Sequence, residues 1–485
     1  MRRWKWFLGL LGAVAVGAIG WSLHNAIRRE PLDAQRFAQM RETEQVEWLI
    51  EQTLARSQRT DTLAVLLNKL PFTAQESLRP LTGMEIMPIG MACVEYDLPH
   101  WLHRCRRYVE RESDREHLQV YLALLQSRKG DWRAAEQTVQ RIRIVPVKAF
   151  ALAHLGRAQA AAGQADAARR SFEQAMTLIG QPISQEYYRY LFFTLELIAR
   201  YSHLGENPQE VARIVQRVPF NIRMYALGIV EHSRRQRGDT DGLRQMIHQS
   251  LPDERAVLKM CLAQALIEQG QVEAGLRELV EIGKCYDYIM AQIAVSLHRH
   301  GRAEDARRIV DALRVGLFQR GFPHRRPTNR ASEMMRLSTP YGEVRVPFKS
   351  PHHTIRRLAR AYAEWGLFSQ AERVLDALPT EHRTLLRMSM SHAHHEAGRQ
   401  AQAHQQLERA LSETQSVPEH GLGLNRSFLR LEIGCVYALC GDDRRALEVA
   451  QSTVSPEQRT VLLCILRNRA YTRNPFWREI LDMPL

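Results

Sequence analysis

The chain has 485 residues, of which 45% are apolar and 25% charged, a balance typical of folded domains and not of disordered chains. Its 67 Lys and Arg residues against 53 Asp and Glu residues give a formal net charge of +14, which favours acidic proteins, anionic lipid or nucleic acid as partners. The seven cysteines are scattered, odd in number and without a CxxC pair, which argues against a disulfide framework or a structural zinc site.

The first 30 residues contain the strongest local signal. Residues 6–23 form an apolar run without a charge, preceded by three basic residues and followed by Arg28 and Arg29. At about 1.5 Å per residue, a helix of this length just crosses a hydrocarbon core of about 30 Å. We therefore predict that residues 1–30 are a single-pass membrane anchor, with the N-terminus in the cytoplasm and the rest exported. The alternative is a signal peptide cleaved near residues 13–15, which would make the protein secreted.

Residues 31–115 show apolar side chains at helical spacing and are predicted to be a helical N-terminal region or degenerate repeats. Within this region, residues 80–99 contain Pro80, Pro88 and Pro99, and we expect a packed loop or a degenerate repeat there.

Residues 116–313 and 352–453 carry a repeated pattern centred on glycine. A small residue recurs five positions after most of these glycines, as at Ala135, Ala306 and Ala446. The glycines are Gly130, Gly163, Gly205, Gly238, Gly270, Gly301, Gly366, Gly398 and Gly441. Most intervals are close to 34 residues. A glycine between two amphipathic segments is typical of a helix–turn–helix hairpin, so the period predicts an all-α protein built of paired helices.

The stretch from Phe150 to Gly180 shows the unit most clearly. Small residues at Gly156, Ala168 and Ala175 alternate with large apolar ones around the turn at Gly163. This pattern resembles the tetratricopeptide repeat (TPR) superfamily. The resemblance implies a right-handed superhelical solenoid of antiparallel helix pairs, whose concave side is lined by the first helix of each pair and binds proteins.

Residues 314–351 interrupt the array. This insertion is basic and holds five prolines, which exclude continuous helices; YGEVRVPF within it could form a short strand or a hairpin. It is either a surface loop that touches an anionic partner or a tolerated insertion. Residues 454–485 are predicted to be a capping helix and a tail that packs back on the last repeat.

No catalytic motif is present, so we predict no enzymatic activity, no cofactor and no metal site. Five residues are the candidate binding site instead. Transfer of the superfamily frame places Arg356, Arg360 and His392 on the concave side where the repeats of Gly366 and Gly398 meet, with one histidine a turn away on each side. We call this basic surface the junction patch; it comprises His353, Arg356, Arg360, His392 and His395. Guanidinium groups suit carboxylate ligands.

The sequence thus predicts a membrane-tethered scaffold that binds an unidentified protein partner through the groove of its repeats. The alternative is an accessory subunit of an envelope system that contacts anionic lipid or polysaccharide. Nucleic-acid binding is disfavoured because basic residues are dispersed and do not alternate with aromatic ones. The pattern specifies neither the partner nor an oligomeric state.

Overall fold

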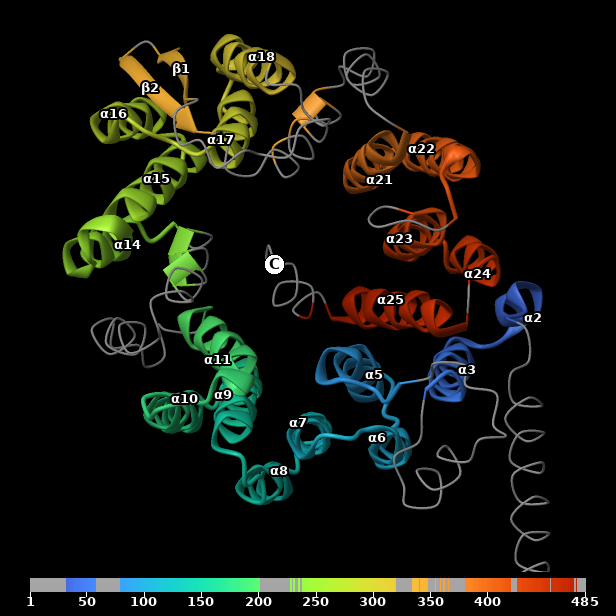
Figure 1. Ribbon diagram of the computed structural model, residues 1–485. Coiled ribbons are helices and arrows are strands. Elements are labelled where there is room, and N and C mark those ends of the chain that lie inside the picture. Colours follow the sequence, from blue (N-terminus) through green and yellow to red (C-terminus); the bar gives the residue numbers. More distant parts are fainter. Residues whose placement is uncertain are drawn as a thin grey trace, which may run out of the picture. The chain divides into compact units, whose positions relative to one another are not determined.

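The computed structural model is mostly helical and divides into two compact units, which we describe separately (Figure 1). Unit 1 joins residues 1–164 to residues 419–485, and unit 2 comprises residues 165–418. The structure describes residues 32–57, 79–200, 227–228, 230–231, 234–235, 238–319, 334–339, 341–347, 354, 358, 361–362, 365, 380–419, 425–453, 455–474 and 477.

The described helices of unit 1 come from both ends of the chain. They are α2 (Ala34–Gln39), α3 (Glu42–Ala55), α5 (Gly83–Glu95), α6 (Pro99–Cys105), η1 (Arg106–Tyr108), α7 (Glu112–Arg128), α8 (Trp132–Gln140), α9 (Val145–Ala161), α23 (Arg426–Leu439), α24 (Asp443–Gln451) and α25 (Ser455–Arg473).

Unit 2 contains helices and one pair of strands. Its described elements are α10 (Ala165–Ile179), η2 (Gln185–Tyr187), α11 (Tyr188–Arg200), α14 (Thr240–Gln249), α15 (Pro252–Glu268), α16 (Val272–Ile282), α17 (Asp287–Arg299), α18 (Ala303–Gln319), β1 (Met334–Thr339), β2 (Gly342–Pro347), α21 (Thr380–Glu396), α22 (Gln400–Glu413) and η4 (Thr414–Ser416).

The predicted inter-helix glycines are helix-ending turns wherever the structure describes them. Seven of the nine have φ between 71° and 81°, the left-handed region that residues with a Cβ avoid. They include Gly238, where the small residue five positions on is missing and Leu243 is buried in its place. The other two glycines, Gly205 and Gly366, lie outside the described residues. The glycine period is therefore confirmed as a series of turns between helices.

Small residues lie where the two helices of a hairpin pack. Ala135, Ala306 and Ala403 have no exposed surface. Gly275 plays the same part between α15 and α16, because a Cβ there would lie 2.6 Å from the carbonyl oxygen of Ala263. The pairs α7–α8, α15–α16, α17–α18, α21–α22 and α23–α24 all pack in this way, so the architecture is helical and repeat-like.

The insertion at residues 314–351 departs from a purely helical fold. Strands β1 and β2 within it form an antiparallel hairpin in which Leu337 and Val344 are buried. The hairpin packs on α16, α17 and α18. Backbone hydrogen bonds hold Arg345 between Gly283 and Cys285, at 3.1 and 2.9 Å. The strand predicted within YGEVRVPF is thus confirmed as β2, while its partner β1 precedes that stretch. The described part of the insertion belongs to the core of unit 2.

Of the two expectations for residues 80–99, the packed loop is wrong, and the degenerate repeat stays a prediction. Residues 83–95 form helix α5, which Thr82 and Glu85 begin with a capping box. Pro88 lies inside the helix, and almost every residue of α5 is buried. Tertiary packing therefore outweighs the local cost of the proline.

Helix α25 packs on α23 and α24, as a capping helix should, and also lies against α3 and α5 (Figure 1). Helix α2 in turn packs on α24. The two ends of the chain therefore share one core in unit 1, which the sequence pattern did not predict.

The predicted membrane anchor at residues 6–23 lies outside the described residues. None of the described helices is both long enough and apolar enough to span a bilayer.

Candidate functional site

The structure describes two of the five predicted junction-patch residues. His392 and His395 lie on the last turns of α21 and are partly exposed. His392 Nδ1 is 3.9 Å from Glu396, and His395 Nδ1 is 2.7 Å from Gln400 Nε2 across the turn. The other three residues of the patch, His353, Arg356 and Arg360, lie outside the described residues. The patch therefore stays a prediction.

Core residues surround the described part of the junction patch. Burial lowers the pKa of His394 to about 4, so its imidazole is neutral at pH 7. Arg387 is buried too, and it donates to Glu413 and Gln406 of α22 at 2.9 Å each. These contacts fix the α21 helix against α22 and hold its two partly exposed histidines, His392 and His395, in place.

A second site, which the sequence analysis did not single out, surrounds Trp477 in the C-terminal tail. Only 3% of Trp477 is exposed. We call its surroundings the Trp477 site, and it comprises Glu95 of α5, Tyr121 of α7, and His154 and Arg157 of α9. Trp477 of the predicted tail thus packs on α5, α7 and α9, where we expected the tail to pack on the last repeat. Residues 478–485 lie outside the described residues.

Glu95 supplies the polar contact of this site. Its Oε1 accepts hydrogen bonds from Trp477 Nε1 at 2.8 Å and from Asn474 Nδ2 at 3.0 Å. Its Oε2 pairs with Arg128 of α7 at 2.5 Å. Because the carboxylate is almost wholly buried, these three partners replace the hydration that it loses.

The apolar part of the site is a layer of rings. The Trp477 ring lies 5.9 Å from that of His154 and 6.5 Å from that of Tyr121, and the Arg157 guanidinium lies 5.5 Å above it. Burial, with help from Arg157, holds the pKa of His154 well below its usual range. The imidazole is therefore neutral and packs as an aromatic ring. Gly90 of α5 makes room, since a Cβ there would overlap the Tyr121 ring.

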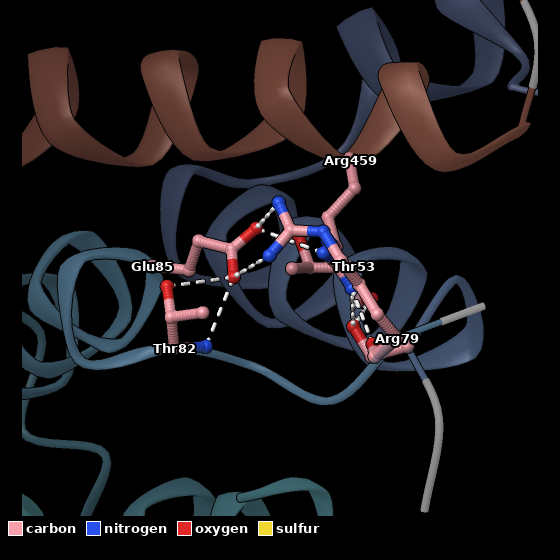
Figure 2. A network of polar contacts seen from close by, with 6 residues as sticks. Thr53, Arg79, Thr82, Glu85 and Arg459 are labelled. Carbon is pink, nitrogen blue, oxygen red and sulfur yellow. Dashed lines mark hydrogen bonds and ion pairs between the residues drawn. The ribbon is translucent and has the colours of Figure 1, made fainter. Parts of the chain in front are cut away.

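Polar contacts also join the first turns of α25 to the N-terminal helices of unit 1. Figure 2 shows the Arg459 guanidinium of α25 reaching the Glu85 carboxylate of α5. The Nη2 atom is 2.8 Å from Glu85, while Nη1 donates to the Arg79 carbonyl at 2.9 Å and to the Ser57 hydroxyl at 3.2 Å. The Arg459 side chain is 1% exposed, so it is a buried tie between segments far apart in sequence.

Arg473 makes a more exposed ion pair at the other end of α25. Its Nη2 pairs with Glu42 of α3 at 3.0 Å, and its guanidinium lies 4.0 Å from the centre of the Tyr96 ring. Two arginines four turns apart thus anchor both ends of the helix, and the second places Asn474 and Trp477 on Glu95.

In the earlier repeats, the positions equivalent to the junction patch belong to the core. Val120, Leu124, Ala153 and Leu195 are at most 5% exposed. The equivalent Ala199 side chain lies outside the described residues. The described positions of this set are therefore not open to a ligand.

The described residues of unit 2 line a surface pocket of about 630 Å³. It lies at the start of α16, beside His300 and Arg302. Both side chains are already engaged: His300 Nε2 is 3.0 Å from the Glu268 carbonyl, and Arg302 pairs with Asp305. No group of three potential metal ligands occurs among the described residues.

The sequence held one signal for the Trp477 site, the aromatic residues of the tail. Nothing local marked Glu95, which lies in the stretch read as a loop. The site is built for binding and not for a reaction. A buried carboxylate accepts the hydrogen bond of the indole N–H, and aromatic rings and a guanidinium pack against the faces of the indole ring. None of its groups is arranged as a nucleophile beside a base.

No protein-family model matches the chain, and no curated protein matches it. Among solved structures, the chain is similar to Ton1535 from Thermococcus onnurineus NA1, at 12% identity over 78% of this chain and 93% of that one, with a TM-score of 0.20. At that TM-score the likeness carries no argument about fold or function.

Proposed function

We propose that the protein is a TPR-like scaffold, tethered to a membrane by residues 6–23, which binds another protein through the surface of its helical hairpins. The hairpins would wind into a right-handed solenoid with the junction patch on its concave side. The proposal assigns no reaction and no cofactor to the chain, and it places the repeats on the exported side of the membrane.

One observation carries this proposal: the same hairpin recurs along the chain with its left-handed glycine and its small packing residue. Each such pair leaves an apolar face that only a neighbour or a ligand covers, and arrays of this kind present long surfaces to proteins. Glycine turns at intervals near 34 residues fit this class better than an irregular helical fold.

The Trp477 site supports the same function in a second way. There, helices α5, α7 and α9 hold a segment of polypeptide through one aromatic anchor and a few hydrogen bonds. Buried aromatic anchors of this kind also dominate the affinity of interfaces between proteins. The fold can therefore hold a peptide segment, here one of its own.

The test is co-purification from gently solubilised membranes, with full-length protein compared with a chain that starts at Leu32. We expect one stoichiometric protein partner with both forms, and full-length protein in the membrane fraction. Full-length protein in the soluble fraction would contradict the anchor. Lipid or polysaccharide without protein, lost at high salt, would favour the alternative of an envelope accessory subunit.

The junction patch is tested in the same experiment. Arg356→Ala/Arg360→Ala should weaken capture of the partner, because it removes two guanidinium groups from the patch. The matched control is Arg169→Ala/Arg170→Ala on α10, where both side chains are exposed. Undiminished capture by the first variant would remove the patch from the proposal and leave the scaffold function standing.

A further inference from the structure

Two cysteines that are 29 positions apart meet in unit 1. Cys435 of α23 and Cys464 of α25 have their sulfur atoms 2.9 Å apart. A disulfide bond has a length of about 2.05 Å, so the two sulfurs are within about 0.9 Å of bonding distance.

The helix packing explains why these two side chains meet. A Cβ at Gly434 would lie 3.1 Å from Val461 of α25 and 3.6 Å from Val449 of α24. The glycine therefore lets α23 and α25 approach closely. Cys435 follows it directly, and Cys464 lies one turn after Val461, so both point into the same narrow contact.

The surroundings of the pair favour attack by one sulfur. The sulfur–sulfur hydrogen bond lowers the pKa of Cys464 and raises that of Cys435. Arg467, one turn further along α25, has its Nη2 atom 4.0 Å from Cys464 and supports the thiolate form. A thiolate is the species that attacks disulfides. Of the two, Cys464 is also the more exposed.

We propose that Cys435 and Cys464 form a reversible disulfide that ties α25 to α23, by exchange with a small disulfide oxidant such as glutathione disulfide. The Cys464 thiolate attacks one sulfur of the oxidant and releases the first glutathione thiolate. Cys435 then loses its proton and attacks the Cys464 sulfur of the mixed disulfide, which releases the second. Two protein thiols are oxidised, one oxidant disulfide is reduced to two glutathione thiols, and the two protons pass to the leaving thiolates.

The bond would secure the helix that joins the two ends of the chain. Helix α25 carries Arg459 to Glu85 and leads into Trp477 on Glu95. Oxidation would hold its middle against α23 while these contacts hold its ends. We expect the oxidised protein to keep α25 folded under conditions in which the reduced protein releases it.

The test is a peptide map of the full-length protein without reduction. The protein is equilibrated with glutathione disulfide or with reduced glutathione, free thiols are alkylated, and trypsin releases residues 431–444 and 460–467. In the oxidised sample we expect these two peptides joined, with the mass of the two unmodified peptides less two hydrogens plus one alkyl group on Cys440. The reduced sample should contain both peptides alkylated.

Variants assign the bond, because the first peptide also contains Cys440 at the end of α23. Cys440→Ala is the matched control and should keep the joined peptide. Cys435→Ala should abolish it. No joined peptide in the folded wild-type protein, or a joined peptide that survives in Cys435→Ala and disappears in Cys440→Ala, would overturn the proposal. The wild-type map alone decides whether a joined peptide forms, so the proposal can still be refuted if a variant does not fold.

Discussion

The Arg459–Glu85 tie offers the sharpest test of how unit 1 is held together. Arg459→Met keeps most of the side-chain volume but removes the hydrogen bonds to Glu85, the Arg79 carbonyl and Ser57. Removing one partner of a buried ion pair costs about 3–5 kcal/mol, because the other charge is left behind. Glu85 keeps its bonds to Arg79 and Thr82, so we expect the lower end, about 3 kcal/mol.

The loss should be local to the contact between α25 and the N-terminal helices. Hydrogen exchange on the full-length protein, followed by mass spectrometry, measures this local loss of stability directly. Since each 1.4 kcal/mol is a factor of ten, protection of the α25 and α3 amides should fall by about 100-fold. Peptides from α15 in unit 2 serve as the internal reference.

The matched control is Arg444→Met on α24. Arg444 is also paired with a glutamate, Glu448 at 3.1 Å, but its side chain is 62% exposed. Exposed pairs contribute about 0–1 kcal/mol, so protection should change by less than about fivefold. If Arg459→Met lowers the protection of the α25 amides as little as the control does, burial does not strengthen the Arg459–Glu85 ion pair, which would refute this prediction.

Three further changes test the site, the turns and a buried histidine. Trp477→Ala should cost about 3 kcal/mol, and Trp477→Phe, which keeps one aromatic ring but loses the bond to Glu95 and part of the packing, about 2 kcal/mol, both measured by exchange of the α7 and α9 amides. Gly130 has a φ of 79° and open space around it, so Gly130→Ala should lower the free energy of unfolding by about 1 kcal/mol and Gly130→Asn by less, measured by urea denaturation. Burial lowers the pKa of His394 from 6.5 to about 4, so the unfolded chain binds its proton first and unit 2 should lose stability as the pH falls from 6.5 towards 4. His394→Leu should flatten that dependence, as read from urea midpoints across this range; an unchanged slope would exclude His394 as its source.

The turns were predictable because each depends on one residue. A left-handed backbone conformation between two helices favours glycine, because residues with a Cβ avoid it. The glycine can be recognised in the sequence without knowledge of the rest of the fold. Gly130, Gly270 and Gly441 show it equally. The small packing residues were predictable for a related reason, since they lie at a fixed offset from the turn within one hairpin.

Contacts between the two ends of the chain were not predictable in this way. Arg459 and Glu85 are 374 positions apart, and each reads in the sequence as an ordinary charge on a helix. Only tertiary packing buries them. Helix α5 was missed for the same reason: Pro88 signals a break locally, and burial on α7 and α25 outweighs that signal.

The cysteine pair connects the fold to the predicted location of the chain. Structural disulfides persist in oxidising compartments and are rare where glutathione and thioredoxin keep thiols reduced. If residues 6–23 hold the repeats on the exported side, Cys435 and Cys464 should be joined in nearly every molecule in the cell. Acid quenching of intact cells, alkylation of free thiols and the peptide map described above would measure that fraction. Cys440 gives the reference for a free thiol in the same peptide. A pair that joins in purified protein but is fully reduced in cells would place the repeats in a reducing compartment, and would contradict the orientation predicted from the basic residues around the anchor.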